Sequence, residues 1–254
     1  MLDPREKFAV LHNLYEQPEE EHIKALIIGG KGSGKTTLLR TCPRPVLLDM
    51  WEPFGEQSLL SNDGALPEWL AVRKWGKKDL KKWANGLAET SKLMEELGGT
   101  YALDPITDWS DALIESISPG VGPTLPLWGK YVNEVMMYMK VILSLPCHVI
   151  MLGHYQRDIA KESGKLVYKI LIPTSAADKA PLPWGEYYHL ECFEGEEPTF
   201  KCADGLCRRL VTRNNGTFKC TSRLGRNGRV GLYERADIAA ILKKTVPNFG
   251  GLGE

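Results

Sequence analysis

The chain has 254 residues, 43% of them hydrophobic and 25% charged, which is ordinary for a globular protein and long enough for one large α/β domain. Lysine plus arginine and aspartate plus glutamate both number 32, so the net charge is zero and no overall field draws the protein to nucleic acid or to a membrane. The apolar runs are far shorter than the roughly 20 residues that span a bilayer, and the first residues do not resemble a secretory signal, so we expect a cytoplasmic protein.

The first part of the chain predicts a unit of strand, helix and strand. Residues 1–22 indicate a short helix and an acidic linker, to which we assign no chemistry. Residues 23–28 are continuously apolar, as in a strand covered on both faces, and a glycine-rich turn and a helix over about 35–41 follow. Residues 46–49 predict a second buried strand that ends in an acid. This repeat is typical of doubly wound α/β sheets.

The middle of the chain continues the pattern. A helix is predicted over 77–97, where leucines and a tryptophan recur at helical spacing until two glycines stop it. Residues 100–104 predict a third buried strand that again ends in an acid. A helix with a methionine-rich face over 128–144 and a fourth buried strand over 147–153 follow.

Beyond residue 184 the pattern changes to short strands and tight turns. Asp204-Gly205 and Asn215-Gly216 lie between alternating runs and are strong hairpin signals, so we predict an antiparallel hairpin region over 185–225. A last helix is predicted over 234–244. The expected division of the chain is therefore a helix and linker over 1–22, a core over 23–246 and a flexible tail over 247–254.

Four cysteines near the carboxyl terminus suggest a zinc site: Cys192, Cys202, Cys207 and Cys220. Their spacing disfavours zinc, because zinc ribbons use paired C-x₂-C knuckles, whereas four residues separate Cys202 from Cys207. We expect these two cysteines to lie opposite each other across the Asp204-Gly205 turn. The other two cysteines, Cys42 and Cys147, sit in apolar surroundings, where a reduced, buried thiol is the usual state.

A phosphate-binding loop is the most specific signal in the sequence. GGKGSGKT fits GxxxxGK[ST] without a mismatch, between an apolar strand and a helix. Its glycines allow consecutive amides to turn inward around phosphate oxygens. Lys35 supplies a positive charge for the β- and γ-phosphates, and the Thr36 hydroxyl can ligate Mg²⁺. The predicted nucleotide-binding residues are Gly29, Gly30, Lys31, Gly32, Ser33, Gly34, Lys35, Thr36 and Thr37.

The metal and the attacking water each require an acid. The metal-side acid should end a buried strand beside the loop, and Asp104 fits, whereas Asp108 and Asp111 are more simply helix caps. Asp49 and Glu52 are the candidates for orienting or deprotonating water. We favour Glu52 because Asp49 still lies in the predicted strand, although either could be a solvated loop acid.

Other polar features carry weaker signals. His154 follows the fourth strand, where a polar residue can contact the γ-phosphate, and a purely structural histidine is the alternative. Residues 75–83 and 155–169 combine cations with aromatic rings, as single-strand channels do. Both stretches could equally be solvated faces with buried aromatic rings.

In their order and spacing these motifs resemble the small phage-encoded P-loop ATPases with a RecA-like core, a group thought to act in phage recombination and single-strand annealing. The resemblance covers residues 22–244 and rests on GGKGSGKTTLLRTCPRPVLLD, TYALDPITDWSD, HVIMLGHYQ and KCTSRLGR. It implies a RecA-like P-loop NTPase of the α/β class, with a mostly parallel central sheet flanked by helices and antiparallel hairpins toward the C-terminus.

The resemblance also implies roles for single residues. Asp104 would hold the metal, Glu52 would activate water, and His154 would be the polar residue at the strand end. Proteins of this kind usually show Asp-x-Glu after the second strand, whereas this chain has one residue more between Asp49 and Glu52. In a ring or filament, two late arginines would reach a neighbour's nucleotide, although a solvated hairpin end is the alternative: Arg223 and Arg226.

We therefore predict a Mg²⁺-dependent ATPase that acts on single-stranded DNA in recombination or annealing, as a homo-oligomer with ATP and Mg²⁺ as cofactors. Loops over 155–183 would line the DNA, and phage single-strand-binding or replication proteins would be further partners. The alternative is a nucleotide-gated switch that recruits a phage replication or packaging protein with little turnover. A small-molecule kinase is weaker, because no lid-like arginine cluster stands out.

Overall fold

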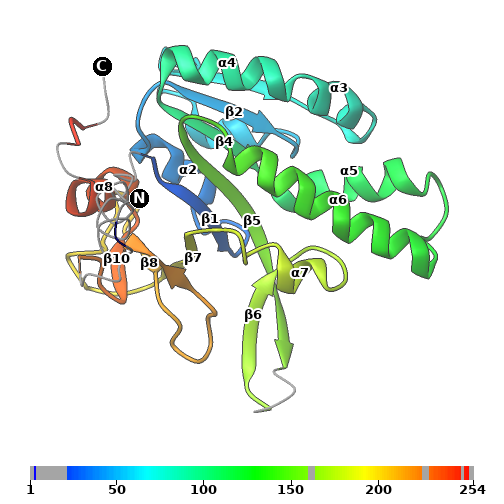
Figure 1. The fold of residues 1–254 in the computed structure, drawn as a ribbon. Coiled ribbons are helices and arrows are strands. Elements are labelled where there is room, and N and C mark those ends of the chain that lie inside the picture. Colours follow the sequence, from blue (N-terminus) through cyan, green and yellow to red (C-terminus); the bar gives the residue numbers. More distant parts are fainter. Residues whose placement is uncertain (1–2, 4–21, 160–163, 225–228, 247–248, 252–254) are drawn as a thin grey trace.

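The computed structural model describes residues 3, 22–159, 164–224, 229–246 and 249–251. Nearly all of the helix and linker predicted over 1–22, and residues 247–248 and 252–254 of the predicted tail, lie outside these ranges. Within the described residues the chain forms a ten-stranded sheet with helices on both faces (Figure 1).

The centre of the sheet is parallel. Its strands are β1 (Lys24–Gly29), β2 (Val46–Met50), β3 (Leu70–Lys74), β4 (Thr100–Asp104), β5 (His148–Ile159) and β7 (Glu186–Phe193). They lie in the order β7-β1-β5-β4-β2-β3. Side chains of β1, β2 and β4 are buried almost throughout, which is why these strands have continuous apolar sequences. Gly29 lies opposite His154 and Met50 lies opposite Asp104, so the candidate residues gather at the carboxyl edge.

Antiparallel strands complete the sheet. β8 (Cys207–Val211) pairs with β7, and β10 (Tyr233–Arg235) pairs with β8. β6 (Leu166–Ile170) pairs with the outer half of β5, and β9 (Thr221–Ser222) pairs with the start of β7. The predicted fold class, α/β with a mostly parallel central sheet and antiparallel strands toward the C-terminus, is confirmed.

Helices cover the two faces of the sheet unequally. They are α2 (Lys35–Leu38), α3 (Leu80–Asn85), α4 (Leu87–Leu97), α5 (Ile106–Ile117), α6 (Leu125–Leu143), α7 (Ala176–Lys179) and α8 (Ile238–Thr245), with 3-10 turns at Leu39–Thr41, Gly55–Leu59 and Lys77–Asp79. One apolar core lies under α3 to α7 and contains Trp83, Trp109 and Tyr131. The other lies under α2 and α8.

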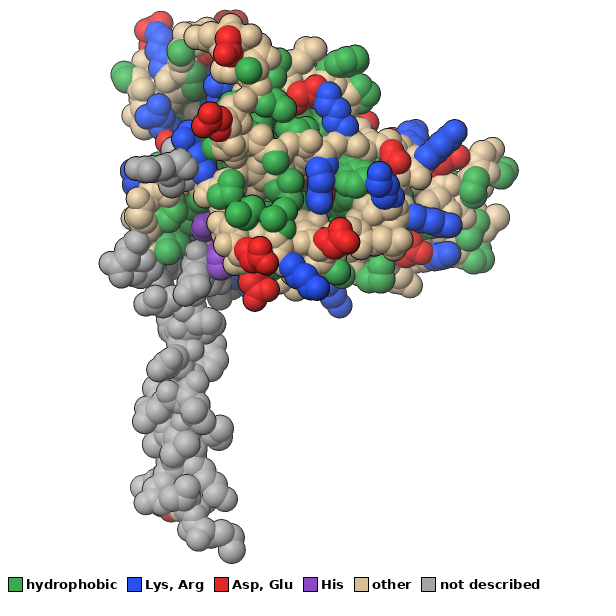
Figure 2. Space-filling model, turned by 90° about the horizontal axis from the view of Figure 1, so that it is seen from above, with side chains coloured by type: hydrophobic (Ala, Val, Ile, Leu, Met, Phe, Trp, Pro, Cys, Tyr) green, Lys and Arg blue, Asp and Glu red, His purple; other side chains and the backbone are tan. Residues whose placement is uncertain are grey.

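The surface carries both signs of charge, in keeping with the equal numbers of acidic and basic residues. Figure 2 shows the face that is uppermost in Figure 1, where lysines and arginines are interspersed with acids and apolar side chains. No helix of the described part is long and apolar enough to cross a membrane. All six cysteines are free, and no group of three or more histidine, cysteine or acidic side chains in the described ranges is arranged to hold a metal.

In the middle of the chain the structure differs from two of the predictions. The helix predicted over 77–97 is divided, because the chain forms a 3-10 turn, then α3, then α4 after Gly86. β3 was not predicted, and α5 was anticipated only through its candidate caps, Asp108 and Asp111. β3 is an edge strand that alternates only partly between buried and exposed residues, so its pattern resembles a loop. The fourth strand is longer than predicted, since β5 continues to Ile159 as one arm of a hairpin with β6.

The structure also differs from the predictions in the carboxyl-terminal region. β7 is parallel to β1, and β8 and β9 both pair with β7 instead of with each other. Residues 199–202 contribute only an isolated bridge in which Lys201, not Cys202, lies opposite Cys207. The last helix begins at Ile238 instead of 234, because the Asp237 side chain accepts a hydrogen bond from the Ala240 amide at 2.9 Å and caps it.

Candidate functional site

The loop between β1 and α2 requires glycine at specific positions. Gly32 and Gly34 have φ angles of 74° and 91°, in the left-handed region that favours glycine. A Cβ atom on Gly29 would lie 2.6 Å from the Ser33 hydroxyl, so no side chain fits there. Lys31, Gly32 and Thr37 are exposed on the loop and the helix that follows. The loop therefore leaves its crest open to a ligand.

Lys35 folds back along the loop. Its ammonium donates to the carbonyl oxygens of Gly30 at 2.8 Å and Gly29 at 3.2 Å. It also lies 3.3 Å from His154 Nδ1, which must accept, because an ammonium group has no lone pair. Burial lowers the pKa of Lys35, and the charges of Asp104 and Glu52 oppose this shift. The lysine is positioned to exchange these weak partners for phosphate oxygens.

Thr36 and Asp104 meet as the sequence predicts. The Thr36 hydroxyl donates to Asp104 Oδ2 at 2.5 Å, and Asp104 is only 2% exposed. Burial raises the pKa of Asp104 to about 6, partly opposed by the hydrogen bond from Thr36 and the charge of Lys35. A buried carboxylate beside a hydroxyl offers the hard oxygen ligands that Mg²⁺ prefers, and Mg²⁺ commonly binds through few protein ligands plus phosphates and water. These two residues fit a magnesium ion.

Glu52 and His154 also lie near Lys35. The Trp51 amide donates to the Asp104 carbonyl at 2.8 Å, which fixes the start of the segment that carries Glu52. The charge of Glu52 contributes to raising the pKa of Asp104 above its usual range, after the larger effect of burial. Burial lowers the pKa of His154, and Lys35 lowers it further. The structure thus brings Glu52 and His154 to the loop.

Asp108 does not cap α5, contrary to expectation. The residue at the cap position is Pro105, which makes no side-chain hydrogen bond there. Asp108 lies in the first turn of α5, where it lines a cavity of about 470 Å³ together with Glu52 and Lys77.

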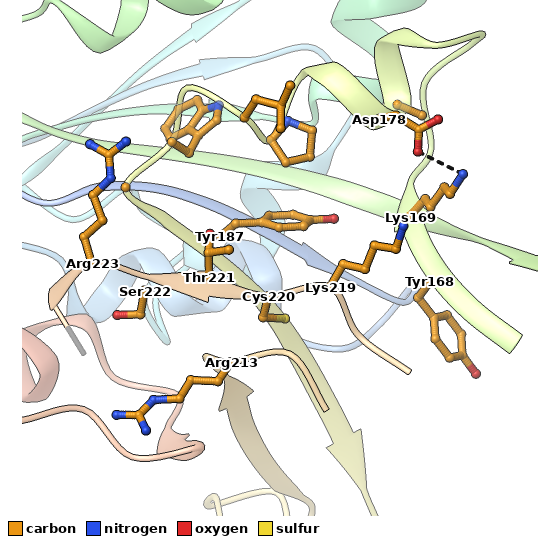
Figure 3. A pocket seen from close by; sticks show the side chains of 15 residues that line it. Tyr168, Lys169, Asp178, Tyr187, Arg213, Lys219, Cys220, Thr221, Ser222 and Arg223 are labelled. Carbon is orange, nitrogen blue, oxygen red and sulfur yellow. Dashed lines mark ion pairs between the residues drawn. The ribbon is translucent and has the colours of Figure 1, made fainter. Parts of the chain in front are cut away.

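Of the two late arginines, the structure describes Arg223, which lies away from this site. Arg226 is outside the described residues. The amides of Arg223 and Leu224 donate to Glu186 Oε1 at 2.9 and 3.0 Å, at the start of β7. Glu186 lies opposite Ala25, near the amino end of β1, whereas the phosphate loop follows its carboxyl end. The exposed Arg223 side chain borders a separate cavity (Figure 3) and is not at the loop of its own chain.

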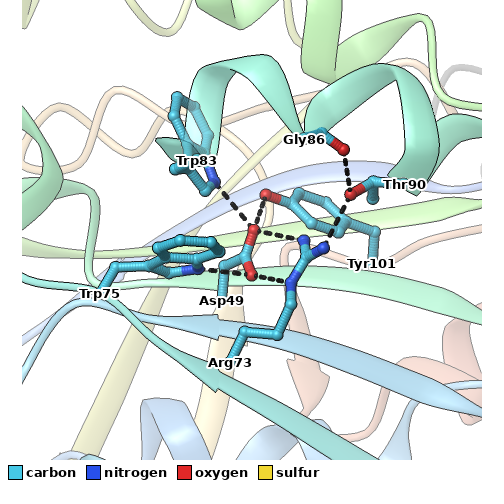
Figure 4. Close-up of polar contacts among 7 residues, drawn as sticks. All are labelled: Asp49, Arg73, Trp75, Trp83, Gly86, Thr90 and Tyr101. Carbon is cyan, nitrogen blue, oxygen red and sulfur yellow. Dashed lines mark hydrogen bonds and ion pairs between the residues drawn. The ribbon is translucent and has the colours of Figure 1, made fainter. Parts of the chain in front are cut away.

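Asp49, the alternative to Glu52, is fully occupied by structural contacts (Figure 4). Its Oδ1 accepts from Arg73 Nε at 2.6 Å and from Trp75 Nε1 at 2.8 Å. Its Oδ2 accepts from Arg73 Nη2 at 2.8 Å, from Trp83 Nε1 at 2.8 Å and from the Tyr101 hydroxyl at 2.7 Å. Because the carboxylate is completely buried and surrounded by donors, it has no free lone pair for water.

Arg208 is a contact of the phosphate loop that sequence reasoning missed. From β8, its Nε donates to the Ser33 carbonyl at 3.2 Å, and its two terminal nitrogens donate to Asp204 at 3.0 and 2.6 Å. A Cβ atom on Gly34 would lie 2.7 Å from Arg208 Nε, so the arginine is packed against the loop. No local pattern marks it, because 175 positions separate it from Ser33.

Replacing Arg208 by alanine should weaken ATP binding about tenfold, the effect of losing roughly one charge-assisted hydrogen bond that orders the loop. Lys201→Ala, an exposed lysine in the same turn region, is the matched control and should leave affinity unchanged. Titration with a fluorescent ATP analogue measures both. Equal affinity of the wild type and the Arg208 variant would show that the loop needs no support from β8.

The comparison with protein families agrees with this geometry. Residues 21–180 match the family described as the AAA domain, a segment that contains the phosphate loop, Glu52, Asp104 and His154. The match covers more than half of the chain, so the protein belongs to this family. It is an ATPase, as the phosphate loop predicts. No curated protein matches the sequence significantly.

Solved structures show distant similarities. A KaiC-like protein from the archaeon Pyrococcus horikoshii has 11% identity and a TM-score of 0.45, over 76% of this chain and 78% of that one. The RadB recombinase has 15% identity and a TM-score of 0.44, over 74% and 79%. An ATPase from the type III secretion system of pathogenic bacteria has 14% identity and a TM-score of 0.44, over 66% of this chain and 51% of its own.

Proposed function

We propose that this ATPase is a phage-encoded, Mg²⁺-dependent protein with a RecA-like core that acts on single-stranded DNA in recombination or annealing, as a homo-oligomer. Residues 29–37 bind the phosphates of ATP, and Thr36 and Asp104 hold Mg²⁺. The metal, when bound, neutralises charge on the β- and γ-phosphates. The 2.5 Å contact between Thr36 and Asp104 supports this assignment.

The hydrolytic step is assigned to the residues around Lys35. Glu52 orients the attacking water, because it is close enough for its charge to push the pKa of both Lys35 and Asp104 upward, alongside the larger effect of burial. Asp49, the alternative, has no free lone pair. His154 contacts the γ-phosphate, because Lys35 lies 3.3 Å from its Nδ1. Arg223 or Arg226 acts on the nucleotide of a neighbouring subunit. The position of Arg223 far from its own loop supports action across a subunit boundary, not within one chain.

The observation that carries the DNA proposal is the continuity of β5. Its parallel half ends at His154, beside Lys35, and the same strand continues into the hairpin with β6, which exposes Arg157. Tyr155 lies against the loop, since a Cβ atom on Gly30 would be 3.3 Å from the tyrosine hydroxyl. The Tyr155 ring packs edge-on against the Tyr168 ring, with 4.8 Å between the ring centroids. A DNA strand bound at the hairpin of β5 and β6 would therefore contact β5, the same strand that reaches the ATP site at His154.

Phosphate release in the presence and absence of oligo-dT tests the proposal. We expect several-fold stimulation of turnover by single-stranded DNA and little by duplex DNA, because a duplex hides the bases from aromatic contact. Slow turnover that is indifferent to DNA would contradict the proposal and favour the nucleotide-gated switch. Omitting Mg²⁺ is the control, and it should abolish hydrolysis in either case.

A further inference from the structure

A large cavity, separate from the phosphate loop, lies on the face of the sheet that α7 covers. Its volume is about 830 Å³, within the range of sites that bind organic ligands. Three separate parts of the chain line it: the end of β6, the segment from α7 to β7, and residues 213–223 (Figure 3). No residue of the phosphate loop borders it.

The charge of the cavity is strongly unbalanced, unlike that of the whole protein. Four cations and a single acid line it: Lys169, Arg213, Lys219, Arg223 and Asp178. Lys169 is held by ion pairs of 2.9 Å to both Asp178 and Asp158, whereas Lys219 and Arg223 are exposed at the surface. In Figure 3 Arg223 lies at one end of the cavity and Lys169 and Lys219 at the other. Exposed positive charge therefore stands at both ends of the cavity, from Arg223 at one end and Lys219 at the other.

Aromatic rings lie between the cations. The Tyr187 ring stands between Arg223 and Lys219 in Figure 3, and Trp184 and Tyr168 also line the cavity. Trp184 is 2% exposed, and its indole N–H has no hydrogen-bond partner. A buried donor without an acceptor is unfavourable by about 1–3 kcal/mol. With Trp184 at 2% and Tyr187 at 4% exposure, these two rings form the packed wall of the cavity.

We propose that this cavity binds single-stranded nucleic acid, with phosphates beside the cations at its two ends. The inference rests on the proposed function and specifies where the DNA strand lies. It leaves Arg226 as the arginine that acts on the nucleotide of a neighbouring subunit. A chain ligand is favoured because cations stand at both ends, and successive phosphates of one strand can reach both. A lone phosphate reaches only one end. Tyr168 also borders a hollow beside Gly30, so the strand would lie next to the ATP site.

Lys219→Glu in the full chain tests the site, because Lys219 is exposed and has no role in ATP hydrolysis. We expect affinity for fluorescein-labelled oligo-dT, measured by anisotropy, to fall at least about tenfold. The slope of log affinity against log salt should shrink by about 0.7 for one lost phosphate contact. Phosphate release without DNA should be unchanged. Lys92→Glu, an exposed lysine on α4, makes the same change of net charge and should bind like the wild type.

The outcomes separate the two proposals. If the wild type and both variants bind oligo-dT equally, the cavity is not the site, and the proposal of a DNA-dependent ATPase stands. If Lys219→Glu and Lys92→Glu weaken oligo-dT binding equally, the cause is the net charge of the protein, and the cavity is again not the site. A wild type that does not bind oligo-dT at all would remove the proposed function and this inference together.

Discussion

Replacing Glu52 by glutamine should reduce ATP turnover about 10²- to 10⁴-fold while leaving ATP affinity within about twofold of the wild type. Glutamine keeps the size of the side chain but cannot accept a proton from the attacking water. Lys35, Thr36 and Asp104, which hold the nucleotide and the metal in our proposal, are untouched. Single-turnover phosphate release and ATP titration on the same preparation separate the chemical step from binding.

The matched control is Glu68→Gln, which removes a charge from an exposed acid in the segment before β3. It should leave both turnover and affinity unchanged, since exposed acids away from the loop contribute nothing to the step. If Glu52→Gln retains wild-type turnover, Glu52 is not the residue that orients water. In that case Asp108, which lines the same cavity, is the next acid to replace.

The core of the site could be predicted from sequence because its signals are local. Residues 29–36 are contiguous, and the φ angles of Gly32 and Gly34 depend on the glycines themselves. Asp104 ends a short apolar run, and parallel strands bring their carboxyl ends to one edge without any detailed knowledge of packing. That Asp104 and Thr36 lie at the same edge therefore follows from the shared direction of the strands, whereas their direct contact depends on packing.

The remaining contacts depend on pairings that no short pattern contains. Arg208 reaches the loop only because β8 lies beside β7, which in turn lies beside β1. The turn signals near residues 204 and 215 are present, but a turn does not determine which strands pair when β7 offers an edge to both β8 and β9. The direction of β7 is likewise set by its buried position next to β1.

Asp49 shows the same limitation for a single residue. Its place at the end of an apolar run suggested catalysis or a solvated loop, and the donors that occupy it come from β3, α3 and β4. Since β3 had no sequence signal, Arg73 could not be recognised as its partner. A buried acid at a strand end is therefore ambiguous until its hydrogen-bond donors are known.

Replacing Asp49 by alanine should lower the free energy of unfolding by about 3–5 kcal/mol, the usual effect of removing one partner from a buried ion pair. The substitution leaves the N–H groups of Trp75 and Trp83 and the hydroxyl of Tyr101 without an acceptor. Arg73 is 32% exposed and can turn to solvent, which places the expected loss toward the lower end of this range. Urea denaturation followed by tryptophan fluorescence measures it.

Glu95→Ala, an exposed acid on α4, is the control and should unfold at the wild-type urea concentration. A more demanding comparison is Asp49→Ala combined with Arg73→Ala. Because each single variant already loses the same ion pair between Asp49 and Arg73, the double variant should be less destabilised than the sum of the two single variants. Exact additivity, or a single Asp49 variant as stable as the wild type, would show that the aspartate does not organise this side of the sheet. Asp49 would then again be a candidate for the chemical step.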